Sequence, residues 1–359
     1  MINQAIAKLA NGDNLGEKEM TAAMKMLLDG TAEPAQIGAF ITALRMKGET
    51  VEEITGAAKA LRSKTKQIEL GAPAVNIDRD EINVEEETIM GTHGNGANGT
   101  QTFNISTATA LVVAAAGLQV AKYGNQALSK QCGSADVLIS LGVNLDINLA
   151  DVEKCIQDIG IGFLYAPLFH GAMKAVAAPR QQVGLRSIFN LIGPLVNPAG
   201  ATSQVLGVYN VAHTEKMARV LQKLGIRTAF VVCGEATFDE ISICGITRVS
   251  QLKDGTIKTF EMTPEAHGLK RAAREAIKGG NAQANAEIIR TVLDGEKGPR
   301  RDVVLLNAAA AFAAAGLDDS FKDGIERAKE SIDSGRAKGK LDSLIEYTRQ
   351  IEFFVRRAI

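Results

Sequence analysis

The sequence predicts an α/β protein with a small N-terminal helical domain and a larger domain built on a mostly parallel sheet. Apolar residues recur at helical spacing through about the first 70 residues. Further along, a strand at 206–211, a helix at 215–224 and a buried strand at 229–233 form a βαβ unit, which indicates parallel strands. A chain of 359 residues is long enough for one large and one small domain.

The composition indicates a cytoplasmic globular protein and gives no support for a polyanion-binding role. Hydrophobic residues make up 46% of the chain, and 40 basic against 41 acidic residues give a formal net charge of −1. The longest apolar run, 108–117, is far too short to span a membrane, and the first residues show no signal-peptide pattern. The four cysteines lack metal-binding spacing, which is typical of reduced thiols. We therefore expect neither a membrane nor nucleic acid as a partner.

Residues 1–72 are expected to form the helical domain. Three breaks separate its segments of helical periodicity: Gly12-Asp13, Asp29-Gly30 and Lys47-Gly48. Pro34 suits the first turn of a helix. Most apolar residues of this bundle are expected in its core, and a share of them in a dimer interface. The larger domain, 73–359, begins within an expected connector at 71–90 that carries an acidic run.

The stretch 91–143 predicts a phosphate-binding site. In its first half, a glycine-rich segment leads to Asn104, Ser106 and Thr107, which stand at the start of an apolar helix expected at 108–116. Residues of these types cap the free backbone N–H groups at a helix start. The same N–H groups, together with the positive end of the helix dipole, can bind a phosphate instead.

The second half of this stretch repeats the pattern. A short strand is expected at 118–121 and ends at Lys122, a polar loop follows, and Ser134 begins a helix that closes at Gly142. Two helix N-termini and a lysine are then expected in one crevice at the carboxyl ends of parallel strands, where α/β proteins bind ligands. A single glycine-rich loop before a helix is also common in α/β proteins that bind no phosphate. Two such loops close together, with a lysine between them, favour phosphate binding.

Two further groups of charged residues are candidates for the site. Asp239 and Glu240 follow the strand expected at 229–233, and a carboxylate pair at a strand end is suited to Mg²⁺; an ordinary loop pair is the alternative. Arg180 and Arg186 are either surface charges or groups that bind an anion. The C-terminal part predicts a β-hairpin around Asp254-Gly255 and helices at 285–293, 303–315 and 321–334.

Four motifs resemble the phosphoribosyl diphosphate (PRPP) loops of the anthranilate phosphoribosyltransferase family. They are Gly91-Thr92-His93-Gly94-Asn95-Gly96, Thr102-Phe103-Asn104-Ile105-Ser106-Thr107, Lys122-Tyr123-Gly124-Asn125-Gln126 and the segment 133–143. The N-terminal helices and the segment 169–198 are also similar to this family, so the resemblance covers the whole chain. It implies a fold like that of the nucleoside phosphorylases and phosphoribosyltransferases, in which helices from about 168–190 join the N-terminal helices.

The resemblance implies a Mg²⁺-dependent transfer of the phosphoribosyl group from PRPP to the amine of anthranilate, with release of diphosphate, by a homodimeric enzyme of tryptophan biosynthesis. The implied catalytic residues are Lys122, Asn125 and Arg180. The implied substrate-binding residues are these three together with Gly91, Gly94, Asn95, Thr102, Asn104, Ser106, Thr107, Ser129, Ser134 and Pro194. The implied Mg²⁺ ligands are Ser106, Asp239 and Glu240.

The motifs also depart from the family's pattern. The departures are His93 for Gly, Asn95 for Asp, a longer segment at 97–101, Tyr123 for His, Gln126 for Arg, Lys130 for Ser, and Ile139-Ser140 for Glu-Ala. They leave open a divergent paralogue that transfers phosphoribose to another aromatic amine, or a catalytically silent relative that binds nucleic acid or another polyanion. A pyrimidine nucleoside phosphorylase is also an alternative, although it would not need the Asp239-Glu240 pair.

Overall fold

The N-terminal part of the chain is a helical bundle, as expected. The computed structural model describes residues 1–70, 74–78, 102–124, 132–169, 171–237 and 239–357. The bundle consists of α1 (Ile2–Ala10), α2 (Glu17–Leu28), α3 (Pro34–Lys47) and α4 (Val51–Arg62). Pro34 occupies the first turn of α3, where its missing N–H costs nothing. Thr50 caps α4 by accepting a hydrogen bond from the backbone N–H of Glu53.

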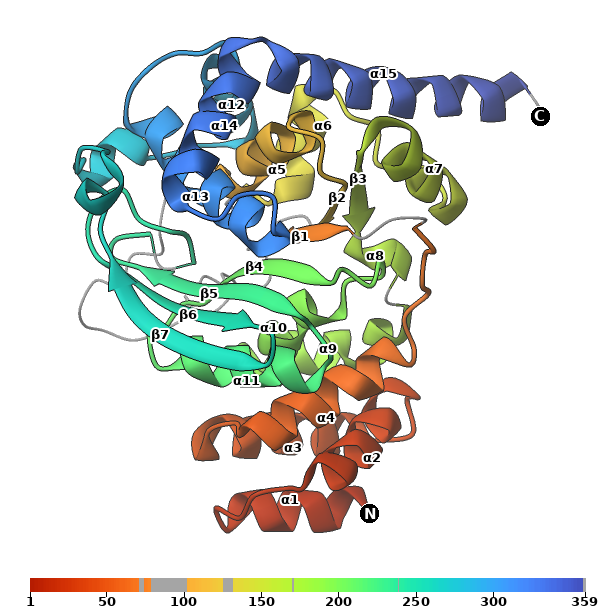
Figure 1. The fold of residues 1–359 in the computed structure, drawn as a ribbon. Helices are drawn as coiled ribbons and strands as arrows, with labels where there is room; N and C mark the ends of the chain where they lie inside the picture. Colours follow the sequence, from red (N-terminus) through yellow and green to blue (C-terminus); the bar gives the residue numbers. More distant parts are fainter. Residues whose placement is uncertain (71–73, 79–101, 125–131, 170, 238, 358–359) are drawn as a thin grey trace.

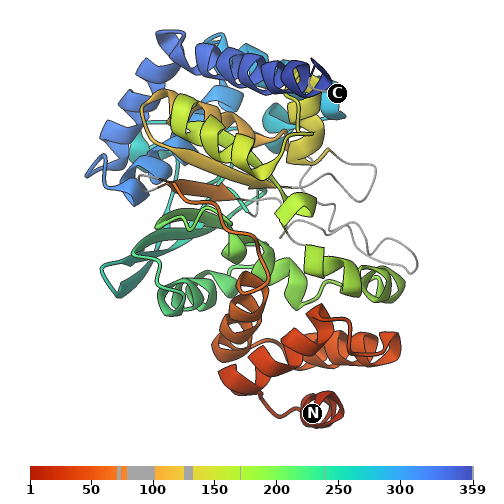
Figure 2. The ribbon, with the colours of Figure 1, turned by 90° about the vertical axis from the view of Figure 1, so that its right-hand side faces the viewer.

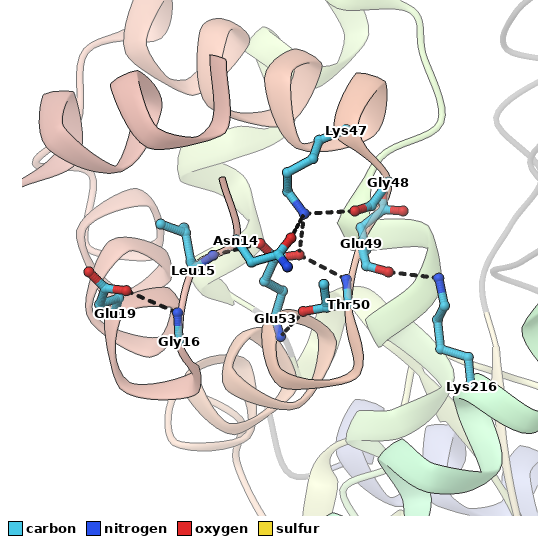
Figure 3. Close-up of polar contacts among 10 residues, drawn as sticks. All are labelled: Asn14, Leu15, Gly16, Glu19, Lys47, Gly48, Glu49, Thr50, Glu53 and Lys216. Atoms are coloured by element: carbon cyan, nitrogen blue, oxygen red, sulfur yellow. Dashed lines mark hydrogen bonds and ion pairs between the residues drawn. The ribbon is translucent and has the colours of Figure 1, made fainter. Parts of the chain in front are cut away.

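A buried ion pair ties the loops of this bundle together (Figure 3). The Glu53 carboxylate is fully buried and accepts hydrogen bonds from the Lys47 ammonium at 2.9 Å, the Leu15 N–H at 2.9 Å and the Thr50 N–H at 2.8 Å. The pair therefore joins the α1–α2 loop to the α3–α4 turn. The Lys216 ammonium donates to the carbonyl of Glu49 at 2.7 Å and connects this turn to the larger domain.

A seven-stranded sheet forms the centre of the larger domain (Figure 1). Its strands are β1 (Val75–Asp78), β2 (Val120–Gly124), β3 (Ile161–Tyr165), β4 (Ser203–Gly207), β5 (Thr228–Gly234), β6 (Thr247–Lys253) and β7 (Thr256–Met262). The order is β3-β2-β1-β4-β5-β6-β7, with the first five strands parallel and the last two antiparallel. Asp254 and Gly255 form the expected hairpin turn, both with positive φ. The prediction of a mostly parallel sheet is confirmed.

Helices cover both faces of this sheet (Figures 1 and 2). They are α5 (Ile105–Ala115), α6 (Ser134–Leu141), α7 (Leu149–Ile159), α8 (Ala166–Phe169), α9 (Lys174–Val183), α10 (Ile188–Ile192), α11 (His213–Lys223), α12 (Ala282–Leu293), α13 (Pro299–Ala315), α14 (Phe321–Asp333) and α15 (Arg336–Arg357). Short 3₁₀ turns lie at Gly171–Met173, Gly193–Val196, Glu265–His267 and Arg274–Ile277. Within the described residues no helix is both long and apolar enough to cross a membrane.

Alternating residues of β5 belong to two separate hydrophobic cores. Phe230 and Val232 pack with α5 and α12–α14 on one face of the sheet. Val231 and Cys233 pack on the other face, in a core that also contains α9–α11 and the apolar residues of α1–α4. Successive side chains of a strand point to opposite faces, so a fully buried strand must supply apolar groups to both. The core of the helical bundle is thus continuous with one face of the sheet.

Three expectations about the strands were wrong. The strand expected at 206–211 is β4, which begins at Ser203 and ends at Gly207. The expected connector at 71–90 contains β1, which pairs in parallel with both β2 and β4 at the centre of the sheet. With only four residues, this strand is too short to show a clear periodicity. The strand expected at 118–121 is β2, which extends to Gly124. Lys122 therefore lies inside a strand and not at its end.

Candidate active site

The strand order defines where a ligand is expected to bind. From β1 the chain proceeds to β2 and β3 on one side, and β4 and β5 lie on the other side of β1. The order therefore reverses between β1 and β4, and open α/β sheets bind ligands at the carboxyl ends of the strands beside such a reversal. The helix α5 follows β1, and α6 follows β2, so both helix N-termini belong to this edge of the sheet.

The N-termini of α5 and α6 carry buried hydroxyl groups. Ser106 and Thr107 lie in the first turn of α5, and Ser134 is the first residue of α6. All three residues are at most 2% exposed. Within the described parts of the chain, their hydroxyl oxygens have no hydrogen-bond partner. Buried hydroxyls are normally satisfied, so these groups are candidates for contacts with a ligand.

Asn104 is the residue that precedes α5, as the sequence predicted, but its side chain does not cap this helix. Its Nδ2 donates to the carbonyl of Cys132 at 3.2 Å, next to the start of α6. Thr102 forms an isolated β-bridge with Lys278, which fixes the chain just before Asn104. The two phosphate-binding segments predicted from the sequence are therefore connected by a direct hydrogen bond.

Lys122 is a buried cation in β2. Lys122 is only 2% exposed, and its ammonium donates to the carbonyl of Tyr123 at 3.4 Å. By strand alternation Lys122 shares a face of the sheet with Val120, which packs in the same core as α5. Tyr123 points to the opposite face and packs in a small separate core with Ala121 and Leu164. The departure at Tyr123 thus changes a core residue on the face opposite to α5.

Close backbone contacts position Asp239 and Glu240. A Cβ atom on Gly207, the last residue of β4, would lie 1.9 Å from the carbonyl oxygen of Asp239. A Cβ atom on Gly234, the last residue of β5, would lie 2.3 Å from the carbonyl oxygen of Glu240. Only glycine permits such an approach. The Asp239-Glu240 segment therefore lies directly against the carboxyl ends of β4 and β5.

An asparagine that the sequence analysis missed holds the other side of this segment. Asn307, inside α13, accepts from the N–H of Ile241 and donates to its carbonyl, both at 3.0 Å. Asp239 and Glu240 are 2% and 4% exposed. The signal available in the sequence was a single polar residue within the apolar run 303–315 of this helix. The carboxylate pair is thus fixed by two strand ends and one helix.

The two arginines lie on the side of the sheet that faces the helical bundle. The Arg180 guanidinium lies 5.0 Å from the centre of the Phe189 ring, and Arg186 lies 4.1 Å from the centre of the Tyr209 ring. Burial lowers the pKa of Arg186 to about 10, although Tyr209 and the nearby Asp239 carboxylate act in the opposite direction. Arg186 is therefore a partly buried cation near the Asp239 carboxylate.

Pro194 belongs to the segment between α10 and β4. It is buried, and its carbonyl accepts a hydrogen bond from the Gln204 side chain at 2.9 Å, which attaches this segment to β4. The remaining predicted site residues lie outside the described residues: Gly91, Gly94, Asn95, Asn125 and Ser129. The departures at His93, Gln126 and Lys130 also lie outside them.

The donor set of the described site suits Mg²⁺ and a polyphosphate. Two carboxylates and a hydroxyl are hard oxygen ligands, and Mg²⁺ commonly binds one or two carboxylates together with phosphate oxygens of a substrate. Ser106 supplies the hydroxyl, with an oxygen that is buried and lacks a partner among the described residues. Among those residues, no cluster of three or more His, Cys, Asp or Glu side chains offers an alternative metal site.

Comparison with known families divides the chain as the structure does. A family model described as "Glycosyl transferase family, helical bundle domain" matches residues 3–65. A second model, described as "Glycosyl transferase family, a/b domain", matches residues 86–338.

Curated proteins and solved structures resemble the chain over nearly its full length. The anthranilate phosphoribosyltransferase of Geotalea uraniireducens is 51% identical over 350 residues, covering 98% of this chain and 100% of that protein. The enzyme of the same name from Geobacter sulfurreducens is 52% identical with the same coverage. The crystal structure of the Thermus thermophilus enzyme has a TM-score of 0.85 at 38% identity, covering 96% of this chain and 99% of that chain. The Saccharomyces cerevisiae enzyme in complex with PRPP and Mg has a TM-score of 0.84 at 27% identity, covering 97% and 98%.

Proposed function

The chain belongs to the anthranilate phosphoribosyltransferase family of glycosyl transferases, and we propose on this premise which of its residues carry out the reaction. The enzyme transfers the phosphoribosyl group of PRPP to the amine of anthranilate, releases diphosphate and uses Mg²⁺ as its cofactor. Identity of about half over the whole chain supports anthranilate as the acceptor despite the departures in the PRPP loops.

The diphosphate of PRPP binds at the N-termini of α5 and α6. The observation that carries this assignment is the set of buried hydroxyl oxygens of Ser106, Thr107 and Ser134, which have no partner within the described residues. Phosphate oxygens would accept hydrogen bonds from these hydroxyls and from the free N–H groups of both helices. The buried ammonium of Lys122 adds a positive charge on the face of the sheet that α5 covers.

Negative charge builds up on the leaving diphosphate as the bond to the ribose C1 breaks, so catalysis depends on charge stabilisation and positioning. Asp239, Glu240 and the Ser106 hydroxyl hold the Mg²⁺, which when bound neutralises part of this charge. Lys122 and the two helix N-termini stabilise the diphosphate from the protein side. No covalent nucleophile is required, since the amine of the acceptor attacks C1 directly.

The acceptor is held by Asn125, Arg180 and Pro194. The planar guanidinium of Arg180 can bind both carboxylate oxygens of anthranilate at once. Its position over the Phe189 ring supports this role, because the contact with the ring orients the plane of the guanidinium. Together with Gly91, Gly94, Asn95, Thr102, Asn104 and Ser129, these residues make up the proposed substrate site.

The helical domain consists of residues 1–72 together with helices from about 168–190. The shared core of α1–α4 with α9 and α10 supports this division. The enzyme is a cytoplasmic homodimer that associates through its N-terminal helices. Met46 on α3 is 83% exposed and offers an apolar group to such an interface. Light scattering on the purified protein measures the oligomeric state directly.

An assay that follows the fluorescence of anthranilate tests the proposed function. The purified protein is mixed with anthranilate, PRPP and Mg²⁺, and consumption of anthranilate is expected to lower the signal. The double variant Asp239→Ala/Glu240→Ala and the variant Arg180→Ala are each expected to abolish the decrease.

Two matched controls remove the same kinds of groups from the surface. Glu261→Ala and Arg219→Ala each break one exposed ion pair and are expected to keep wild-type activity. A wild-type protein that leaves the fluorescence unchanged, while PRPP with Mg²⁺ raises its melting temperature, would contradict anthranilate as the acceptor. Full activity of the carboxylate double variant would contradict the proposed metal site.

A further inference from the structure

Asn285 in α12 contacts the start of α5 from a distant part of the chain. It is 2% exposed, and its Nδ2 donates to the Oδ1 of Asn104 at 2.9 Å. Its own Oδ1 accepts from the N–H of Gly280 at 2.7 Å. Because Asn104 also donates to the carbonyl of Cys132, these groups form a continuous chain of three hydrogen bonds.

The direction of this chain is fixed at both ends by backbone groups. A backbone N–H can only donate, so the oxygen of the Asn285 amide must face Gly280. The nitrogen of that amide then faces Asn104, which must present its oxygen. The nitrogen of the Asn104 amide consequently faces the carbonyl of Cys132, which can only accept. Neither amide can flip without losing two hydrogen bonds.

Tight packing holds the two segments against each other. The N–H of Phe103 donates to the carbonyl of Ile277, and Thr102 bridges to Lys278. A Cβ atom on Gly279 would lie 2.7 Å from the backbone N of Phe103 and 2.6 Å from the Asn285 Oδ1. Gly279 thus lets the chain before α12 approach the chain before α5 closely enough for the asparagines to meet.

We propose that Asn285 is a positioning residue for the diphosphate site: it fixes the amide of Asn104 and thereby holds the N-termini of α5 and α6 in register. This inference rests on the proposed role of those two N-termini in binding diphosphate. Asn285 is not proposed to touch the substrate. Its effect passes through Asn104, whose hydrogen bond to Cys132 joins the residues just before the two helices.

The test measures the KM for PRPP, the KM for anthranilate and the melting temperature in a set of variants. Asn285→Asp keeps the size of the side chain and the bond from Gly280 but removes the donor to Asn104. Asn285→Ala removes both bonds. Each is expected to raise the KM for PRPP about 2- to 10-fold, the effect of losing one hydrogen bond. The KM for anthranilate is expected to change less than about twofold.

Asn281→Ala is the matched control. Asn281 is exposed and caps the same helix, α12, by accepting a hydrogen bond from the N–H of Ala284 at 2.9 Å. Its loss is expected to lower the melting temperature while leaving the KM for PRPP unchanged. If Asn285 acted only on the stability of α12, its variants would behave like this control.

A double-mutant cycle with Asn104→Ala identifies the route of the effect. The double variant Asn104→Ala/Asn285→Ala is expected to bind PRPP as Asn104→Ala does, because Asn285 has nothing left to position. Additive effects, or an unchanged KM for PRPP in Asn285→Asp, would overturn the inference.

Ser106→Ala distinguishes a failure of the proposed role of Asn285 from a failure of the proposed diphosphate site. If it raises the KM for PRPP and the Asn285 variants do not, only the role of Asn285 fails; if it has no effect, the proposed diphosphate site fails.

Discussion

Two regions of the molecule bury polar groups in opposite ways. In the helical bundle, the carboxylate of Glu53 accepts three hydrogen bonds, and its partner Lys47 donates three (Figure 3). At the N-termini of α5 and α6, the hydroxyls of Ser106, Thr107 and Ser134 are equally buried but have no partner within the described residues. The comparison separates polar groups that hold the fold from polar groups that are kept ready for a ligand.

The largest expected effect lies in the bundle. Glu53→Ala removes one partner of a buried ion pair, which leaves the Lys47 ammonium without its counter-charge and two backbone N–H groups without an acceptor. We expect the free energy of unfolding to fall by about 3–5 kcal/mol, the usual cost of breaking a buried pair. Chemical unfolding monitored by circular dichroism measures this loss.

Glu19→Gln is the control for this prediction. Glu19 also forms an ion pair, with Lys8, but both side chains are about half exposed, and the expected cost is about 0–1 kcal/mol. A loss as small as this in Glu53→Ala would show that the buried network contributes little to the stability of the bundle.

The next effect falls on catalysis and not on stability. Ser106→Ala removes a hydroxyl that has no partner among the described residues, so the free energy of unfolding is expected to stay the same or to rise. Hydrogen bonds to charged groups are worth about 1.5–3 kcal/mol, so kcat/KM for PRPP is expected to fall about 10- to 100-fold. Steady-state kinetics and thermal unfolding of the same preparation measure both quantities.

A second buried serine against the same helix gives the reverse pattern. The hydroxyl of Ser331, in α14, donates to the carbonyl of Val112 in α5 at 2.8 Å. Ser331→Ala is expected to cost about 1 kcal/mol of stability and to leave kcat/KM unchanged. Both variants delete one buried oxygen near α5. If they lowered stability and activity to the same extent, the distinction between structural and ligand-binding polar groups would fail at α5.

Much of this site was predictable because the signals are local. The residues at the start of α5, those at the start of α6 and the carboxylate pair after β5 each form a short continuous stretch of sequence. The helical periodicity of α1–α4 and the βαβ unit from β4 to β5 follow from the spacing of apolar residues. Each of these features depends on residues only a few positions apart.

The features that were missed depend on contacts between distant residues. Asn104 and Asn285 are separated by 181 positions, and nothing in either local sequence indicates that they meet. The same holds for Asn307 and Ile241. Whether a buried serine has a partner is equally hidden, since Ser106 and Ser331 differ only in what the fold brings near them. The sequence therefore predicts which types of residue lie at the site, while the fold determines which of their polar groups are left to bind a ligand.

The smallest expected effect concerns His213, which shares features of both regions. One ring nitrogen, Nε2, lies 3.2 Å from the hydroxyl of Tyr209, and the other, Nδ1, is buried without a partner among the described residues. Burial, together with the nearby cations Lys216, Arg45 and Arg186, lowers the pKa of His213 to about 4. The folded protein therefore keeps this histidine neutral.

The sign of the resulting pH dependence follows from linkage. An unfolded histidine titrates near pH 6.5, so below that pH the unfolded chain binds a proton that the folded chain excludes. The stability due to neutral His213 is complete above about pH 6.5 and is lost as the pH falls toward 4. Because the ring is partly exposed, we expect a loss of only about 1 kcal/mol between pH 7.5 and 5. His213→Phe keeps the aromatic contact with Tyr209, and its free energy of unfolding should fall less than that of the wild type over this pH range. Urea unfolding at both pH values measures the two losses. Equal losses would mean that the buried Nδ1 of His213 has no effect on the pH dependence of stability.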